Sequence, residues 1–304
     1  MMPEPLHGIV PVLAVPFQPD DTLDLEGFAA VVDHVLQTGV TGVTLFGLAS
    51  EFHKLGDDER VVLRRLLLER TRERPDITAV ISVTEHATNR AVEVARAAVA
   101  DGADAVNVLP PHFLSPSAHA VANHIDAILG AVEVPVIVQY APSQTGTALA
   151  PEVLRQLRRD HDNLAAVKVE TQPPGRYVAM LKDGDPALDS LVGYAGLQMP
   201  DALHRGAIGI QPGCSFTELY VELWRRHASG DADGFRALHA EMLPWLASWM
   251  QHVELIIQVE KTILARRGLI ASERCRSPGW ALDAEERRGI ESFLDRFTDR
   301  LRLP

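Results

Sequence analysis

The chain has 304 residues, of which 46% are hydrophobic, and its formal net charge is −12. A chain of this length and apolar content can bury one large core, and α/β barrels commonly fill roughly 250 residues as a single unit. The acidic balance and the lack of a basic cluster with interleaved aromatic residues argue against a nucleic-acid partner. We also expect no membrane partner, because no uncharged run reaches the length of a bilayer span.

Cysteine usage and the N-terminal segment bear on the compartment. Cys214 and Cys275 are too few for a disulfide framework and lack metal-type spacing. The segment Met1-Met2-Pro3-Glu4-Pro5 lacks the basic and apolar regions of a secretory signal. We therefore expect a cytoplasmic protein. We expect no metal either, since neither the histidines nor the acidic residues show ligand spacing.

Apolar runs typical of strands alternate with amphipathic segments typical of helices. Strands are predicted at residues 9–15, 40–46, 77–83, 105–109, 134–139, 164–169, 190–193 and 207–211. The helices that follow them are predicted at 25–38, 57–72, 87–100, 117–129, 151–159, 176–181, 199–205 and 216–228. Strands separated by helical crossovers pair in parallel, and eight such units predict a closed (β/α)8 TIM barrel over residues 1–230.

The strand pattern stops after Gly230. Three further helices are predicted at 232–250, 253–267 and 283–301, with a Ser277-Pro278-Gly279 turn before the last. The predicted fold is therefore an α/β barrel followed by a C-terminal helical domain over residues 231–304.

In a (β/α)8 barrel the active site lies at the C-terminal ends of the strands. This rule selects the segments 47–51, 84–86, 110–113, 139–142, 168–170, 193–196 and 211–213. Within them, the residues that we expect to bind a substrate are Ala49, Ser50, His112, Tyr140, Gly193 and Gln211.

Lys168 lies inside the apolar run Leu164–Val169 and is followed by Glu170. Alternation along a strand places Lys168 and Glu170 on one face. Burial disfavours an ammonium ion, and a neutral amine can attack a carbonyl carbon to form a Schiff base. The alternative is a lysine at a strand end whose ammonium reaches solvent.

Four segments in chain order carry a resemblance to known enzymes. They are Gly8-Ile9-Val10-Pro11-Val12, Gly47-Leu48-Ala49-Ser50-Glu51, Pro142-Ser143-Gln144-Thr145-Gly146 and Val167-Lys168-Val169-Glu170. Together they resemble the dihydrodipicolinate synthase / N-acetylneuraminate lyase family of class I Schiff-base aldolases, over nearly the whole chain. The resemblance implies that Lys168 forms an imine with a small 2-oxo acid, that no further cofactor is needed, and that the protein is a homotetramer.

The same resemblance has departures. The synthases use one threonine and two tyrosines as a proton relay, and these positions hold Leu48, Phe113 and Gln139. Gln144 replaces the arginine that would bind the carboxylate of the second substrate. Leucine, phenylalanine and an amide cannot exchange protons near neutral pH, which disfavours the synthase condensation of pyruvate with an aldehyde.

The segment Gln139-Tyr140-Ala141-Pro142 is closer to the 2-keto-3-deoxy-L-arabonate dehydratase-like branch, in which an aspartate stands where this chain has Tyr140. The predicted activity is a lyase, a dehydratase or an aldolase, acting on a 2-oxo acid such as a 2-keto-3-deoxy sugar acid. A catalytically silent barrel that binds an oxo acid and the synthase condensation remain as alternatives.

The catalytic residues implied by this reading are Lys168, Gln139 and Glu170. Gln139 can orient a hydroxyl or a water, and Glu170 can tune the lysine or act as base, unless it pairs with an arginine instead. His112 and Tyr140 are further proton-carrier candidates, with packing as the alternative. The N–H groups of Ala49 and Ser50 and the Ser50 hydroxyl could bind a carboxylate, unless Ser50 serves a turn.

Overall fold

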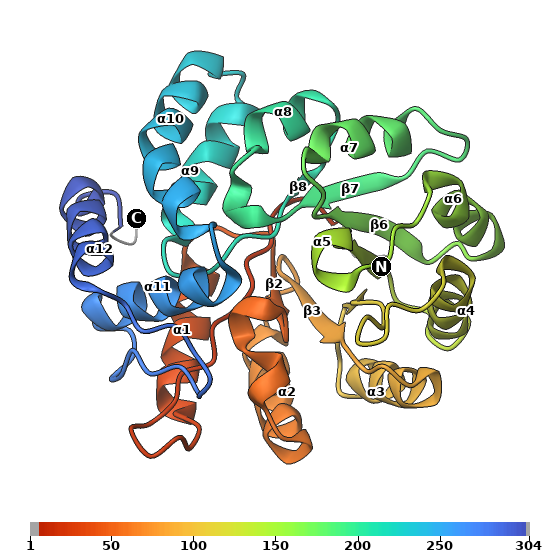
Figure 1. Ribbon diagram of the computed structural model, residues 1–304, viewed down its shortest axis with the longest axis horizontal. Coiled ribbons are helices and arrows are strands. Elements are labelled where there is room, and N and C mark those ends of the chain that lie inside the picture. The colour runs from red at the N-terminus through yellow and green to blue at the C-terminus, as the bar shows by residue number, and fades with distance from the viewer. Residues whose placement is uncertain (1–5, 302–304) are drawn as a thin grey trace. The chain divides into compact units, whose positions relative to one another are not determined.

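The structure of the protein, a computed structural model, describes residues 6–301 (Figure 1). The strands in this range are β1 (Gly8–Ile9), β2 (Gly42–Leu45), β3 (Thr78–Val83), β4 (Ala105–Val108), β5 (Val136–Tyr140), β6 (Leu164–Val169), β7 (Asp189–Val192) and β8 (Gly209–Ile210). They form one eight-stranded sheet in the order β1-β8-β7-β6-β5-β4-β3-β2. This order, with helical connections between parallel strands, is that of a (β/α)8 barrel, and it confirms the predicted fold class.

The helices follow the predicted alternation closely. They are α1 (Leu25–Gln37), α2 (Asp57–Thr71), α3 (Thr88–Ala100), α4 (Ala118–Leu129), α5 (Pro142–Thr145), α6 (Pro151–Asp160), α7 (Pro174–Lys182), α8 (Met199–His204), α9 (Thr217–Ala228), α10 (Ala232–Trp249), α11 (Val253–Arg266) and α12 (Ala284–Phe297). Short 3-10 turns are η1 (Leu48–Ser50), η2 (Phe52–Lys54) and η3 (Tyr194–Gly196). Within residues 6–301, none of the helices combines the length and apolarity of a bilayer span.

The chain divides into two compact units. The middle unit consists mainly of Thr71–Gln211 and contains β3 to β8, and the terminal unit consists of Gly8–Arg70 and the chain from Pro212 onward. The predicted domain boundary at residue 230 does not coincide with this division, because α10, α11 and α12 group with Gly8–Arg70. A helical segment does begin at Ala232, and no strand follows it up to residue 301.

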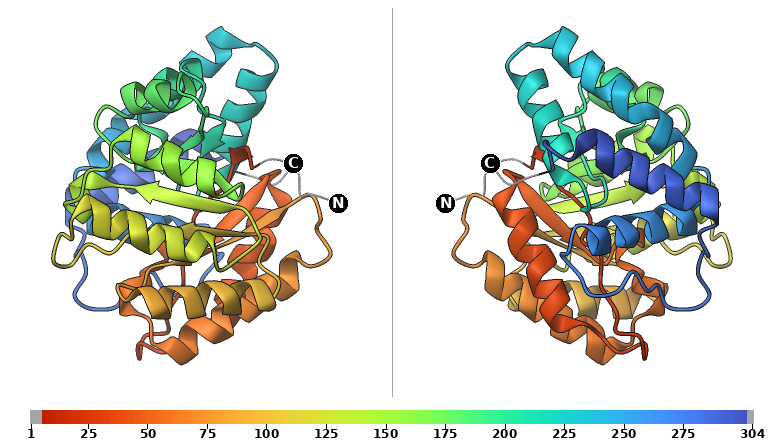
Figure 2. Two further views of the ribbon diagram at one scale, coloured as in Figure 1. Left: turned by 90° about the vertical axis from the view of Figure 1, so that its right-hand side faces the viewer. Right: turned by 90° about the vertical axis from the view of Figure 1, so that its left-hand side faces the viewer.

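The middle unit is a parallel ladder covered by helices. Its strands are rich in valine and isoleucine and are buried almost throughout, as expected for parallel strands. Helix α3 packs on β3 and β4, α7 packs on β6 and β7, and the helices contact one another in chain order (Figures 1 and 2). The register pairs Lys168 of β6 with Gln139 of β5 on one side and with Leu191 of β7 on the other.

Two local predictions need correction. The first strand was expected over residues 9–15, but the structure has only Gly8–Ile9 and an isolated bridge between Val12 and Thr44. Pro11 has no N–H to donate, and it therefore interrupts the ladder. The short helix α5 was not expected; Pro142 starts it and Gly146, with φ of 68°, ends it.

An aromatic cluster forms part of the core of the terminal unit. The ring of Phe293 on α12 lies 5.0 Å from that of Phe216, 5.1 Å from that of Trp249 and 4.9 Å from that of Phe297. Most of these pairs meet edge to face or tilted, the geometry that aromatic rings favour. The C-terminal helices are thus held to the start of α9 by buried apolar surface.

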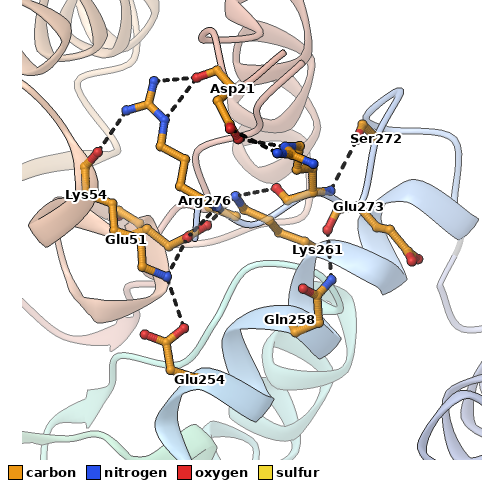
Figure 3. A network of polar contacts seen from close by, with 12 residues as sticks. Asp21, Glu51, Lys54, Glu254, Gln258, Lys261, Ser272, Glu273 and Arg276 are labelled. Carbon is orange, nitrogen blue, oxygen red and sulfur yellow. Dashed lines mark hydrogen bonds and ion pairs between the residues drawn. The ribbon is translucent and has the colours of Figure 1, made fainter. Parts of the chain in front are cut away.

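A buried ion cluster ties α11 to the loop after β2 inside the terminal unit (Figure 3). Lys261 of α11 is fully buried and pairs with the fully buried Glu51, which also lies 3.0 Å from Lys54 Nζ. The Lys261 ammonium donates to the Arg274 carbonyl at 3.0 Å and lies 4.0 Å from the ring centroid of Phe17. Burial lowers the pKa of Lys261 from its ordinary value, although Glu51 acts in the opposite direction. Glu51 therefore anchors the loop through its pairs with Lys261 and Lys54.

Replacing Lys261 by methionine should destabilise the protein strongly. The change leaves the Glu51 carboxylate buried with one cation fewer, and breaking a buried pair in this way costs about 3–5 kcal/mol. Chemical denaturation followed by circular dichroism measures the loss.

Lys182→Met is the control, because Lys182 forms an exposed pair with Asp189 and such pairs contribute about 0–1 kcal/mol. Equal losses in the two variants would contradict the structural role of the buried cluster.

Candidate active site

Lys168 is a buried lysine at the C-terminal end of β6. Its side chain is only 6% exposed, and Nζ lies 3.3 Å from Oε1 of Glu170. Strand alternation puts both residues on one face, and the flexible glutamate side chain turns back along the strand to reach the amine. The ammonium does not extend to solvent, and the described partner of Glu170 is this lysine rather than an arginine.

Glu170 is held by an amide from the neighbouring strand. Gln139 Nε2 donates to Glu170 Oε2 at 2.6 Å, and Gln139 Oε1 accepts from Asn107 Nδ2 at 3.2 Å. Asn107 Nδ2 also donates to Ser82 Oγ at 3.2 Å. These five side chains, Ser82, Asn107, Gln139, Glu170 and Lys168, form a continuous hydrogen-bonded row across β3 to β6, which we call the polar chain.

Sequence reasoning missed Ser82 and Asn107. Asn107 is the single polar residue in the apolar run 105–109, and Ser82 lies among apolar residues near the end of the run 77–83. The two residues are direct register partners on β3 and β4, and both are buried. A lone polar residue in a buried strand needs a hydrogen-bond partner, and that signal could have pointed to them.

Gly193 gives Glu170 the space that it occupies. A Cβ at Gly193 would lie 2.1 Å from Glu170 Oε1, so no larger residue fits without moving the carboxylate. After it, Tyr194 and Ala195 have φ of 52° and 51°, a conformation that non-glycine residues adopt at some cost and that clusters at functional sites. The structure thus gives a packing reason for a glycine at position 193. The expected substrate contact of Gly193 stays a prediction.

A small hollow adjoins the ends of β6 and β7. It is lined by Val169, Thr171, Gln172, Pro174, Val192, Gly193, Tyr194, Leu197 and Gln198. Lys168 and Glu170 are not part of the lining, although Val169 lies between them in the chain and Gly193 touches Glu170.

Tyr140 points away from the polar chain. Its ring stacks on that of Tyr177 of α7 with centroids 4.2 Å apart, and burial raises the pKa of the Tyr140 phenol. Alternation explains this placement, because Tyr140 follows Gln139 directly and so faces the helix layer. The structure thus shows a packing role for Tyr140, and its expected substrate or proton-carrier role stays a prediction.

His112 lies in the loop after β4 beside His86. The centroids of the two rings are 4.5 Å apart, and the backbone N–H of His112 donates to His86 Nδ1 at 3.4 Å. His112 Nδ1 donates to the Pro110 carbonyl at 3.3 Å, and burial together with the His112 ring lowers the pKa of His86. The neighbouring Phe113 is 81% exposed. The expected role of His112 stays a prediction.

The loop after β2 belongs to the terminal unit, and its Ser50 has a structural role. The Ser50 hydroxyl donates to the Leu13 carbonyl at 2.6 Å and accepts from the Phe46 N–H at 3.1 Å, while its own N–H donates to the Gly47 carbonyl. The single hydroxyl proton is thus used in a turn contact, and the expected carboxylate contact of Ser50 stays a prediction. A substrate role for Ala49 stays a prediction.

Gln211 follows β8 in the middle unit. Its side chain is buried, and its N–H donates to the Val192 carbonyl at 2.9 Å. Its substrate role stays a prediction. Within residues 6–301, no group of histidine, cysteine, aspartate or glutamate side chains is placed to hold a metal ion.

The polar chain places a primary amine and a carboxylate in contact. A primary amine beside a carboxylate can add to a ketone and hand its protons to the neighbour, which is the arrangement that covalent catalysis by lysine requires. The amide of Gln139 can hold the carboxylate in place but cannot carry protons. Of the two side chains, the Glu170 carboxylate is therefore the one that can exchange protons with Lys168.

Gly193→Ala should reduce activity far more than stability. The methyl group displaces the Glu170 carboxylate from Lys168, and misplacement of a catalytic group by about 1 Å costs on the order of 100-fold in rate. Turnover of a 2-oxo acid and a thermal unfolding curve test the two effects separately. Gly130→Ala is the control, since a Cβ there meets its nearest atom at 3.5 Å; equal turnover in the two variants would contradict the role of Gly193.

Comparison with known proteins identifies the family. Residues 5–296 match the dihydrodipicolinate synthetase family. The chain is 28% identical to a 4-hydroxy-tetrahydrodipicolinate synthase of Phocaeicola vulgatus over 77% of this chain and 78% of the relative. It is 29% identical to an uncharacterized DapA-like lyase of Halobacterium salinarum over 95% and 93%. The crystal structure of the dihydrodipicolinate synthase from Rhodopseudomonas palustris superposes with a TM-score of 0.88 at 25% identity, over 97% of this chain and 99% of that one. The chain belongs to the dihydrodipicolinate synthetase family and is a lyase.

Proposed function

We propose that this lyase forms a Schiff base between Lys168 and a 2-oxo acid, such as a 2-keto-3-deoxy sugar acid, and then dehydrates or cleaves the bound substrate. The observation that carries the proposal is the buried Lys168 amine, 3.3 Å from a carboxylate that Gln139 holds at 2.6 Å. No cofactor is needed in this scheme, because the imine itself withdraws electrons.

In the first step the neutral amine of Lys168 adds to the C2 ketone. The carbinolamine loses its oxygen as water, and the products are the protonated imine and one water molecule. Glu170 accepts the proton that the ammonium must release before attack, and it returns a proton to the departing hydroxyl. The proton count balances with one carboxyl group acting in turn as base and acid.

In the second step the imine draws electrons from C3. A dehydratase removes a C3 proton and expels the C4 hydroxide, which leaves as water with a proton from the acid form of Glu170. An aldolase instead removes the proton of the C4 hydroxyl, breaks the C3–C4 bond and releases an aldehyde. The enamine that remains takes this proton at C3 from the acid form of Glu170 and becomes an imine again. In both cases water hydrolyses the final imine and regenerates Lys168.

The names of relatives favour a second candidate. Several are called 4-hydroxy-tetrahydrodipicolinate synthase, which suggests a condensation of pyruvate with an aldehyde. Against it, Leu48, Phe113 and Gln139 cannot relay protons, and Gln144 carries no charge to bind a second carboxylate. The Gln144 amide donates to the Tyr194 hydroxyl at 3.0 Å, a neutral pair better suited to a hydroxylated substrate.

Assembly and location are proposals of the same kind. A homotetramer is supported by the family resemblance, and a cytoplasmic location by the low cysteine content of the sequence. The partner that follows from the chemistry is a small 2-oxo acid.

Pyruvate and borohydride should label Lys168. Borohydride reduces an imine to a stable secondary amine, which peptide mass spectrometry locates. Lys168→Arg should abolish the label, since a guanidinium does not form the imine, whereas Lys182→Arg should retain it because Lys182 is exposed. If the wild type gave no adduct with pyruvate or any other small 2-oxo acid, the catalytically silent barrel would be the better description.

Glu170→Gln should separate imine formation from proton transfer at C3. The variant should reach the wild-type extent of pyruvate trapping, although more slowly because Glu170 also moves protons during imine formation. Exchange of the pyruvate methyl protons with D2O, followed by NMR, should fall by roughly 100-fold or more, as when a general base is lost. Unchanged exchange would mean that another group is the base. Product analysis over deoxy-sugar acids, with pyruvate release indicating an aldolase, then distinguishes cleavage from dehydration.

A further inference from the structure

We propose that Asn107 is a positioning residue: it sets the orientation of the Gln139 amide, which donates to Glu170 and so holds this carboxylate beside Lys168. The inference rests on the proposed function, in which Glu170 moves protons for the Lys168 imine. Asn107 touches neither the amine nor the carboxylate, and it acts only through Gln139.

The hydrogen bonds of Asn107 leave one orientation for Gln139. Asn107 is 1% exposed, and its amide nitrogen donates to Ser82 Oγ and to Gln139 Oε1, each at 3.2 Å. Gln139 must therefore present its oxygen to Asn107 and its nitrogen to Glu170. The 2.6 Å contact between Gln139 Nε2 and Glu170 Oε2 is the result.

The reverse orientation would place the Gln139 oxygen against Glu170. Two acceptors in contact repel unless the carboxyl group carries a proton, and a protonated Glu170 cannot act as base. In a buried row the effect is large, because water is not available to replace a mismatched bond. One amide on β4 thus decides which group of Gln139 faces a carboxylate two strands away.

The described hydrogen bonds of the Asn107 side chain are the two that its nitrogen donates, to Ser82 on β3 and to Gln139 on β5. Within residues 6–301, its Oδ1 is buried without a hydrogen-bond partner. The nitrogen is therefore the group through which Asn107 acts on the row.

Few charged groups compete for Glu170. Lys168 faces it from its own strand at 3.3 Å, and Gln139 from β5 is neutral. From the loop after β7 come the Gly193 backbone and Tyr194, whose hydroxyl is bonded to Gln144. Tyr140 lies on the other face of β5 in its stack with Tyr177. Reorienting the Gln139 amide should therefore change the rate of proton transfer by Glu170.

The test is Asn107→Asp, which replaces one NH2 group by oxygen at nearly constant shape. Gln139 then bridges two carboxylates but can donate to only one, so the pair retains a proton up to higher pH. The probe is pyruvate, with borohydride trapping for imine formation and methyl exchange in D2O for proton transfer.

We expect exchange at neutral pH to slow by roughly tenfold or more, the effect of losing a hydrogen bond to a charged group. The acid limb of its pH profile should move to higher pH, while the extent of trapping at saturating pyruvate stays near that of the wild type. Asn107→Leu removes the donor without adding an acceptor. Its exchange rate should therefore lie between those of the wild type and Asn107→Asp. A packing role alone would make leucine at least as harmful as aspartate.

Asn163→Asp is the matched control. Its amide also donates twice, to the Leu129 carbonyl at 3.1 Å and the Val132 carbonyl at 2.8 Å, but it precedes β6 at the end of the strand opposite Lys168. The pH profile of methyl exchange in Asn163→Asp should match that of the wild type, even if the stability of the variant falls.

The proposal is overturned if a folded Asn107→Asp exchanges at the wild-type rate with the wild-type acid limb. Should that variant fail to fold, a folded Asn107→Leu with wild-type exchange overturns it instead. Absence of trapping in the wild type would refute the proposed function, which is a separate outcome.

Discussion

The contact between the Lys168 amine and the Glu170 carboxylate is the interaction on which the site depends. Each group alone would pay a large desolvation penalty at this depth, and together they offset it only if their remaining hydrogen bonds are satisfied. The register of β5 and β6 supplies that condition, since it sets Gln139 beside Lys168 with its amide within reach of Glu170. A polar row inside an apolar ladder is thus tolerated because each member that touches Glu170 is paired.

Comparison of two buried lysines shows why burial alone does not make a reactive amine. Lys261 is enclosed by the Glu51 carboxylate, the Arg274 carbonyl and the Phe17 ring, and its role is to tie α11 to a loop. Lys168 has one described carboxylate partner, at the end of a strand where a (β/α)8 barrel places its chemistry. The surroundings of the amine, and not its burial, distinguish the two.

The amides in the polar chain also limit the chemistry. Amides hold partners in place without exchanging protons, so Gln139 and Asn107 can orient the row while the Glu170 carboxylate is left to transfer protons. The orientation of each amide is therefore a chemical variable.

The sequence by itself determined the kind and order of the elements, because hydrophobic periodicity and the residues that start and stop helices act locally. It also determined that Lys168 and Glu170 share a strand face, since alternation has a period of two. The exceptions in the fold, the shortened β1 and the added α5, follow from prolines at 11 and 142.

Only the tertiary structure decided which side chains meet. That Ser82 and Asn107 join Gln139, that Tyr140 stacks on Tyr177, and that the Ser50 hydroxyl serves Leu13 depend on register between strands and on side-chain rotamers. These are contacts between residues far apart in the chain, and no local pattern encodes them, because each depends on where a neighbouring element places its own atoms.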